Sequence, residues 1–305
     1  MGEGTGLDKE GKRVLFIGSG TGDHLWALLL NRWSYALKWL GHDVLAMDYR
    51  EAMSRQDLGL ILCDHYDYDV LILQDTHLPL PYALRAKSCA AHVAIITHSE
   101  CIQGERDKAY LGAMAPDAVY TDQPVGASMF SAFAPTVRWL GVGADMRCAS
   151  SPVKDIDILW IGNRYPEREA DVEREVEPLL NTEYKVAMYG QGYPGEQVNP
   201  STMFDLMSRA KIVVSVTHPG CVEGGYCGMR IADALASGAY VVSNKYFKDR
   251  VSFPCKGVSF VDRDGIYEQV LVDLHRRDRE ADALAGSVFV RRKRMAYHDM
   301  GKVMN

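Results

Sequence analysis

The sequence predicts an α/β protein with two tandem Rossmann-like domains, and three observations support this class. Short apolar runs without polar alternation recur along the chain, which is typical of strands buried on both faces. Helical stretches separate these runs, in the order expected of a parallel sheet covered by helices. A segment rich in glycine, serine and proline, residues 141–154, interrupts the pattern before it starts again. We expect the domain boundary and a hinge in that segment.

The first half is expected to form an N-terminal domain over residues 12–145. Its predicted strands are the apolar runs at 14–17, 44–47, 70–73, 93–97, 118–120 and 136–140. A long amphipathic helix is predicted from residue 24 to about 40, with Asp23 as its N-cap and Gly41 as its stop.

The second half is expected to form a C-terminal domain over residues 155–285. Its predicted strands are the runs at 156–161, 184–189, 211–216, 240–243 and 258–261, with charged or amphipathic helices between them. Residues 286–305 are expected to form a helix that packs back toward the first domain. Because ligands of such sheets bind outside the carboxyl ends of the strands, candidate site residues are sought just past those ends.

Composition excludes several classes of function. The chain has 305 residues and a formal net charge of −6, which argues against a general nucleic-acid or anionic-membrane binder. No apolar run reaches the roughly 18 residues that a membrane span needs. The polar residues 1–12 resemble neither a signal peptide nor an anchor. The seven cysteines form no CxxC pair, so we expect reduced thiols, a cytoplasmic location and no structural metal.

The stretch from Gly228 to Gly238 reads as a glycine turn, a short helix and a second glycine before a buried strand. The free backbone amides at Gly228 and Met229 begin the helix, where the dipole favours an anion. Arg230 and Asp233 share one helix face, offering a cation for phosphate and a carboxylate for sugar hydroxyls. The alternative is an ordinary helix–glycine–strand connection with a surface ion pair.

A glycine loop, residues 18–22, follows the first predicted strand. It resembles the first motif of S-adenosylmethionine methyltransferases, with Asp48 available for the ribose. Against this, Phe16 stands where those enzymes commonly carry an acid, and Asp48 lies 30 residues after Gly18 rather than roughly 20. A tight turn without a ligand, or a loop facing the interdomain cleft, also fits. The residues of this predicted acceptor or cleft loop are Gly20, Thr21, Gly22, Asp23 and His24.

Four motifs together resemble a family. Residues 157–168 (DILWIGNRYPER) look like an F-V-G-N-x-Y-P-x-R opening of a donor domain, and residues 230–238 like R-v-F-E-A-L-A-x-G. Residues 36–44 are similar to A-L-x-x-x-G-H-e-V and residues 137–145 to v-x-x-L-p-x-G-a-D. In this order they resemble group 1-type glycosyltransferases of the two-Rossmann-domain (GT-B) fold, nearest the spore-maturation CgeB-like branch.

The resemblance implies transfer of a hexosyl or pentosyl group from a nucleoside diphosphate, retaining and independent of metal or cofactor. Arg164 and Arg230 would stabilise the leaving diphosphate, His98 would contact the sugar, and Asp233, aspartate where the family has glutamate, would hold the ribose. The implied catalytic residues are His98, Arg230 and Asp233. The implied donor-binding residues are Gly162, Asn163, Arg164, Gly190, Thr217, His218, Gly228, Met229, Arg230 and Asp233.

The expected partners are a nucleotide-sugar, UDP- or GDP-linked, and a small-molecule, glycan or modified-base acceptor. Three alternatives remain at this point: the methyltransferase described above, a binding protein that has lost catalysis, and DNA-base glycosylation. The last rests on the basic cluster at residues 291–294, which on most helices is a solvated face.

Overall fold

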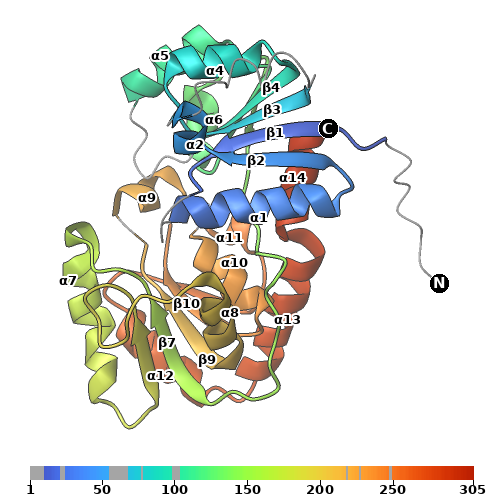
Figure 1. Cartoon of the computed structure of the whole chain (residues 1–305). Coiled ribbons are helices and arrows are strands. Elements are labelled where there is room, and N and C mark those ends of the chain that lie inside the picture. The colour runs from blue at the N-terminus through green and yellow to red at the C-terminus, as the bar shows by residue number, and fades with distance from the viewer. Residues whose placement is uncertain are drawn as a thin grey trace.

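The computed structural model describes residues 10–20, 25–54, 68–76, 78–97, 104–217, 219–226, 228–246 and 249–305. These residues form two parallel sheets in tandem, each covered by helices, so the predicted fold class is confirmed (Figure 1). The N-terminal sheet has the strand order β2-β1-β3-β4-β5-β6, and the C-terminal sheet has the order β11-β10-β9-β7-β8.

The strands begin and end within a few residues of the predicted runs. The N-terminal strands are β1 (Arg13–Gly18), β2 (Asp43–Asp48), β3 (Tyr68–Gln74), β4 (Ala90–Thr97), β5 (Ala118–Thr121) and β6 (Thr136–Trp139). The C-terminal strands are β7 (Ile156–Ile161), β8 (Val186–Tyr189), β9 (Ala210–Ser215), β10 (Tyr240–Asn244) and β11 (Val258–Val261).

Helices connect the strands on both faces of each sheet. Those of the N-terminal half are α1 (Leu25–Trp39), α2 (Tyr49–Ser54), α4 (Leu80–Lys87), α5 (Gly104–Met114) and α6 (Pro124–Met129). Those that follow are α7 (Pro166–Glu175), the 3-10 turn η1 (Glu177–Asn181), α8 (Pro200–Arg209), α9 (Pro219–Gly224), α10 (Met229–Ala236), α11 (Asp249–Ser252), α12 (Ile266–His275), α13 (Arg279–Lys293) and α14 (Ala296–Met304).

The central strands are apolar without alternation because each side of the sheet has its own core. In β1, Val14 and Phe16 belong to one buried cluster, and Leu15 and Ile17 belong to another. Successive side chains of a strand point to opposite faces, so a strand covered on both sides must be apolar throughout.

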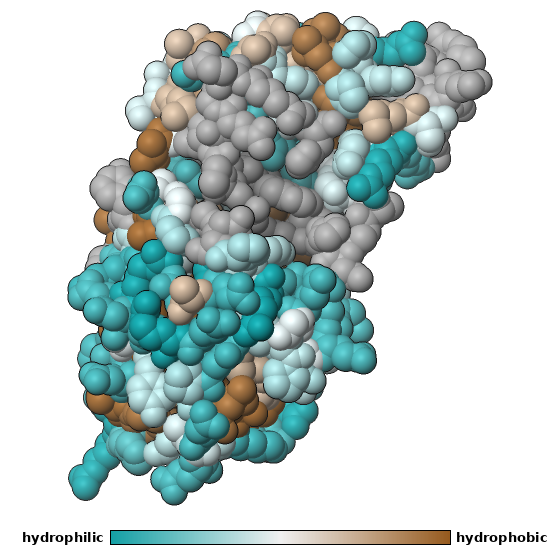
Figure 2. Space-filling model, turned by 90° about the vertical axis from the view of Figure 1, so that its left-hand side faces the viewer, coloured by the Kyte–Doolittle hydropathy of each residue, from teal (hydrophilic) through white to brown (hydrophobic). Residues whose placement is uncertain are grey.

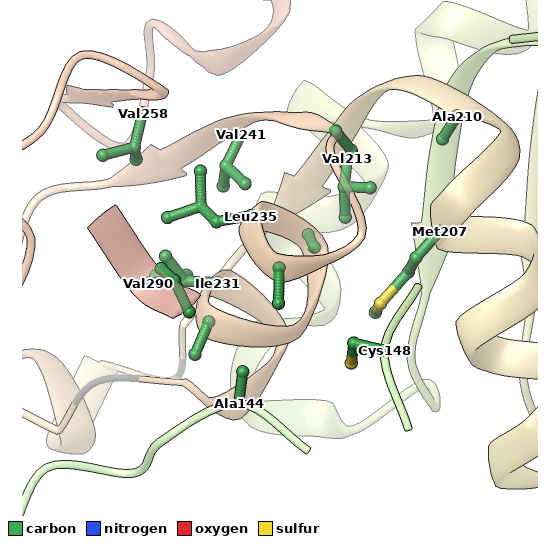
Figure 3. Close-up of a cluster of buried hydrophobic side chains, with 14 of the residues drawn as sticks. Ala144, Cys148, Met207, Ala210, Val213, Ile231, Leu235, Val241, Val258 and Val290 are labelled. Carbon is green, nitrogen blue, oxygen red and sulfur yellow. The ribbon is translucent and has the colours of Figure 1, made fainter. Parts of the chain in front are cut away.

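The C-terminal sheet is built in the same way. Figure 3 shows one of its two clusters, in which Ile231 and Leu235 of α10 pack against Val213 and Val241 of the sheet. These helix residues lie four positions apart, the spacing that places side chains on one face. Helix α10 is therefore fixed by its apolar face against the sheet.

The chain crosses between the domains twice, and the two crossings lie side by side. Ala144 of the first crossing forms an isolated parallel β-bridge with Met295 of the second. After Met295, helix α14 packs beside α1 on the N-terminal domain (Figure 1), where Met300 joins the same core cluster as Val14. Helix α13 runs unbroken through residue 286, so the turn toward the first domain comes at its end.

The outer face of the lower, C-terminal domain is largely hydrophilic in the view of Figure 2. Helix α7, which carries the charged sequence PEREADVERE, lies on this side of the domain in Figure 1. Among the described residues, no helix is both long enough and apolar enough to span a bilayer.

Candidate functional site

Two arginine side chains meet at the carboxyl end of β7. Arg230 of α10 donates from Nη1 to the carbonyl oxygen of Ile161 at 2.6 Å, and its guanidinium lies 5.7 Å from the Trp160 ring centroid. The guanidinium of Arg168, from α7, lies 5.4 Å from the ring centroid of Trp160 and 5.0 Å from that of Tyr165. Aromatic faces and strand-end carbonyls thus hold both cations at the edge where ligands of such sheets bind.

Gly162 leaves the space in which these arginines meet. A Cβ at this position would lie 2.9 Å from Nη1 of Arg230 and 3.0 Å from Nη2 of Arg168. Arg168 is 6% exposed and also donates to the Val216 carbonyl at 3.5 Å. Its Nη2 donates to the Asn163 carbonyl as well, so Arg168 is largely enclosed and Arg230 is the more exposed of the two cations. Positive charge beside a bare backbone is chemistry suited to a diphosphate.

The loop after β8 closes on the same point. Gly190 has a φ of +131°, and a Cβ there would collide with the Gly162 carbonyl oxygen. The backbone N–H of Arg164 donates to the Gln191 carbonyl at 3.0 Å, and the Gln191 N–H donates to Oδ1 of Asn163 at 3.1 Å. The predicted residues Gly162, Asn163 and Gly190 are therefore brought together.

The start of α10 also borders this site, together with the end of β7 and the loop after β8. Gly228 precedes the helix as its N-cap residue and makes no side-chain cap hydrogen bond. The start of a helix favours an anion. Ser215 and Thr217, at the end of β9, lie about 4 Å from the position of a Gly228 Cβ. The N–H of Thr217 donates to Oδ1 of Asn244 at 2.6 Å, which fixes the adjacent strand ends to each other.

Arg164 is oriented differently from the prediction. Its guanidinium forms ion pairs with three carboxylates of the helical segment that follows it, those of Glu169, Glu173 and Glu177. It also lies 5.7 Å from the ring centroid of Tyr193. The hydrogen bond to Glu177 and the neighbouring acids raise the pKa of Arg164 and occupy its donors. Arg168, which the prediction did not name, is the residue that lies beside Gly162 together with Arg230.

Asp233 requires a larger correction. Its side chain is 0% exposed, and both of its oxygens are engaged. Oδ2 accepts from Nη2 of Arg32 at 2.6 Å, and Oδ1 accepts the backbone N–H of Asp145 at 2.9 Å. The prediction that Asp233 holds a ribose does not fit this geometry, because a fully buried carboxylate with these partners has no surface to offer a nucleotide.

The glycine loop of the N-terminal domain is fixed by its own neighbours. Oε1 of Gln74 fills the space beside Gly18, and Oδ2 of Asp48 accepts the Gly20 N–H. Oδ1 of Asp48 accepts the Arg50 N–H at 2.7 Å, so this carboxylate supports the loop rather than standing free for a ribose. The methyltransferase alternative is not favoured.

Several predicted residues lie outside the part of the chain that the structure describes. They are Thr21, Gly22, Asp23, His24, His98 and His218. The strand before His98, β4, ends at the same sheet edge as β1 and β3. Across the described residues, no group of three or more His, Cys, Asp or Glu side chains is arranged to hold a metal ion.

The two domains also touch at the mouth of this region. Gly224, at the end of α9, lies against the side-chain amide of Gln123, which follows β5. A Cβ at Gly224 would collide with Oε1 of Gln123, so a larger residue there would displace the Gln123 side chain. The carboxyl edges of both sheets therefore contribute to one region.

Comparison with known proteins shows what the chain is similar to. Residues 154–305, which include both arginines and α10, match a family model described as "Glycosyl transferase-like". The second half of the chain is therefore similar to this glycosyl transferase-like family. No curated protein sequence matches the chain.

The whole chain has the fold of solved glycosyltransferases. It superimposes on a glycosyltransferase from Rickettsia africae with a TM-score of 0.68 and 10% identity, over 96% of this chain and 97% of that one. For sucrose-phosphate synthase from Thermosynechococcus elongatus the TM-score is 0.62 and the identity 12%, over 96% and 98%. For an E. coli protein described as "Trehalose-6-phosphate" and bound with UDP-2-fluoro glucose, the values are 0.61 and 10%, over 96% and 98%. At these identities the likeness establishes the GT-B fold alone.

The sequence-based prediction of a site missed two residues. Arg168 closes the motif at residues 157–168 and could have been found there. Arg32 lies on the buried face of α1, between Leu29 and Trp33, which are at most 1% exposed. A charge on an apolar helix face is a signal that it has a buried partner.

Proposed function

We propose that this protein is a glycosyltransferase of the CgeB-like branch that moves a sugar from a nucleoside diphosphate to an acceptor hydroxyl. The observation that carries the proposal is the meeting of Arg168 and Arg230 at Gly162, beside the start of α10. The family match of residues 154–305 supports it.

Breaking the glycosidic bond leaves growing negative charge on the departing diphosphate. Cations and amides fixed before the reaction stabilise that charge without having to reorganise. Arg168 and Arg230 would bind the diphosphate oxygens together with the amides of Met229 and Arg230. A protein cation in this role would make a divalent metal unnecessary, and we propose a metal-independent and retaining transfer.

The remaining donor contacts would come from the loops around this point. Asn163, Gly190 and Thr217 border the diphosphate site, and His218 follows Thr217 along the chain. His98 and the loop from Gly20 to His24 would approach from the N-terminal domain and contact the sugar and the acceptor. An acceptor that is a small molecule or glycan suits the acidic net charge of −6 better than DNA does.

The first test is binding. A ligand that binds only the folded protein raises its melting temperature by mass action. We expect UDP or GDP, and the corresponding UDP-glucose or GDP-mannose, to raise the melting temperature, and S-adenosylmethionine to leave it unchanged. Stabilisation by S-adenosylmethionine alone would refute the proposal.

The second test is turnover with Arg230→Met. We expect nucleotide release from the stabilising donor to fall by at least about tenfold, as for removal of a donor to a developing anion. Treatment with EDTA should leave the wild-type rate unchanged. The matched control is Arg209→Met, which removes a 2.6 Å arginine–aspartate pair with Asp155 at a distance from the site. Wild-type turnover in Arg230→Met would refute the role of Arg230. If the wild type binds the donor without turning it over, the protein is a nucleotide-sugar-binding protein.

A further inference from the structure

A buried ion pair joins the two domains behind the proposed site. Arg32 belongs to α1 of the N-terminal domain and Asp233 to α10 of the C-terminal domain, 201 positions apart in sequence. Their side chains are 0% and 1% exposed, and the charged atoms lie 2.6 Å apart. Burial alone lowers the pKa of Arg32, but the carboxylates of Asp233 and Asp145 raise it above its usual value, so the guanidinium stays charged.

The same pair holds the segment that connects the domains. Nη1 of Arg32 donates to the Gly143 carbonyl at 2.8 Å, and the Asp145 N–H donates to Asp233 at 2.9 Å. The N–H of Gly143 donates to Asp299 of α14 at 2.6 Å. Arg32 and Asp233 thus each bind the partner helix and one residue of the first crossing.

A buried ion pair is a weak source of stability, because desolvation of both charges offsets their attraction. Its role here is to fix the orientation of the two helices. A guanidinium holds its N–H donors in one plane, so hydrogen bonds to several acceptors at once allow only one orientation of the Arg32 side chain. Apolar side chains of similar volume would fill the space without fixing the rotation of α1 relative to α10.

Each partner also lies a short way behind a glycine turn at the carboxyl edge of its sheet. Helix α1 begins at Leu25, after the loop that includes Gly20, and Arg32 lies roughly 10 Å along its axis. Helix α10 begins at Met229, after Gly228, and Asp233 lies roughly 6 Å along its axis. A tilt at the ion pair therefore moves the two turns relative to each other.

We propose that Arg32 and Asp233 are positioning residues for the transfer step, and that their pairing sets how the acceptor loop and the donor helix face each other. The proposal rests on the proposed function. It assigns Asp233 to the geometry between the domains and not to the nucleotide. Under this proposal the C-terminal domain binds the nucleotide alone, whereas turnover requires both domains in the correct relative orientation.

The experiment compares Arg32→Met, Asp233→Leu, Asp233→Asn and the double variant Arg32→Met/Asp233→Leu with the wild type. In each we measure melting temperature, affinity for UDP and GDP by calorimetry, nucleotide release from UDP-glucose and GDP-mannose, and small-angle X-ray scattering. The single variants should melt at lower temperature because each leaves a buried charge or polar group unpaired. The apolar double variant should recover part of that loss, since it removes both charges but still deprives the Gly143 carbonyl and the Asp145 N–H of their partners.

Turnover and affinity should separate. In the double variant we expect turnover to remain at least about tenfold below the wild type, since a misplacement of about 1 Å can cost roughly a hundredfold. Nucleotide affinity should stay within about threefold of the wild type, a shift of less than 1 kcal/mol. The scattering profile should show a larger radius of gyration. Arg32→Lys, which keeps the charge, should recover part of the turnover.

Two results would overturn the assignment. Full turnover and an unchanged scattering profile in the double variant would show that the pair only fills space between the helices and does not orient the domains. A loss of nucleotide affinity in both Asp233 variants, with Arg32→Met unaffected, would return Asp233 to the ribose. A wild type that neither binds these nucleotides nor turns over their sugars would refute the proposed function, and the melting and scattering measurements would still decide whether the pair sets the domain arrangement.

Discussion

Asp299 offers a quantitative test of the domain boundary. Its side chain is 0% exposed on α14, and it accepts the Gly143 N–H of the first crossing. Burial raises its pKa from 3.8 to about 6, and the charges of Lys302 and Arg294 oppose that rise only in part. Substitution by asparagine keeps an acceptor for Gly143 and removes the titration.

The sign follows from proton binding. Between pH 3.8 and about 6 the folded protein holds a proton at Asp299 that the unfolded chain has released, so stability is present at low pH and is lost as pH rises. A shift of about 2 units corresponds to about 3 kcal/mol, of which about 2 kcal/mol is lost between pH 4.5 and 7. The free energy of unfolding of the wild type should fall by that amount relative to Asp299→Asn.

Urea denaturation of both proteins at intervals of pH from 4.5 to 7 measures the difference. Because every other titrating group is shared, subtracting the two curves isolates Asp299. A difference that stays flat with pH would show that Asp299 titrates normally in the folded protein. A difference of opposite slope would show that Lys302 and the Gly143 N–H outweigh burial.

Two further predictions concern the donor site. Gly190→Ala should destabilise the protein by about 1–3 kcal/mol, because it places a side chain at positive φ and against the Gly162 carbonyl. Its control is Gly301→Ala in helix α14, where nothing lies within 4 Å of the added methyl group and stability should rise; equal unfolding midpoints for the two variants would contradict this account. Arg164→Gln should change nucleotide affinity by less than about threefold, whereas Arg168→Met should lower it by at least about tenfold, as expected for loss of one charge-assisted contact. Calorimetry with UDP and GDP compares the two, and the reverse order would restore Arg164 to the site.

The strands were predictable because burial on both faces leaves a signal in consecutive residues. The run Val14–Ile17 was recognisable as a strand from its own four residues. The observed β1 is longer than this run by one residue at each end. The partner of Arg32 leaves no such signal, since Asp233 lies 201 positions away and only the packing of the domains brings it near.

Arg164 is an intermediate case. Its three carboxylate partners all lie within 13 positions, in the acidic segment that includes α7. The charge pattern therefore contained the information that Arg164 would be occupied. Arg168 is four positions further on, and there the rings of Trp160 and Tyr165 decide the orientation. The sequence motif identified the segment, and the order of aromatic and acidic neighbours decided which arginine faces the site.

The position of α14 has a consequence for how the chain is made. The N-terminal core contains Met300, Val303 and Met304 together with Val14 and Phe16, so that domain lacks part of its core until residues 300–304 have been synthesised. Domains made first on the ribosome usually fold first. Here the C-terminal domain, continuous from β7 to α13, can complete its core before its predecessor does. We therefore expect fragments that stop before residue 296 to hold a folded donor domain attached to an incompletely packed partner.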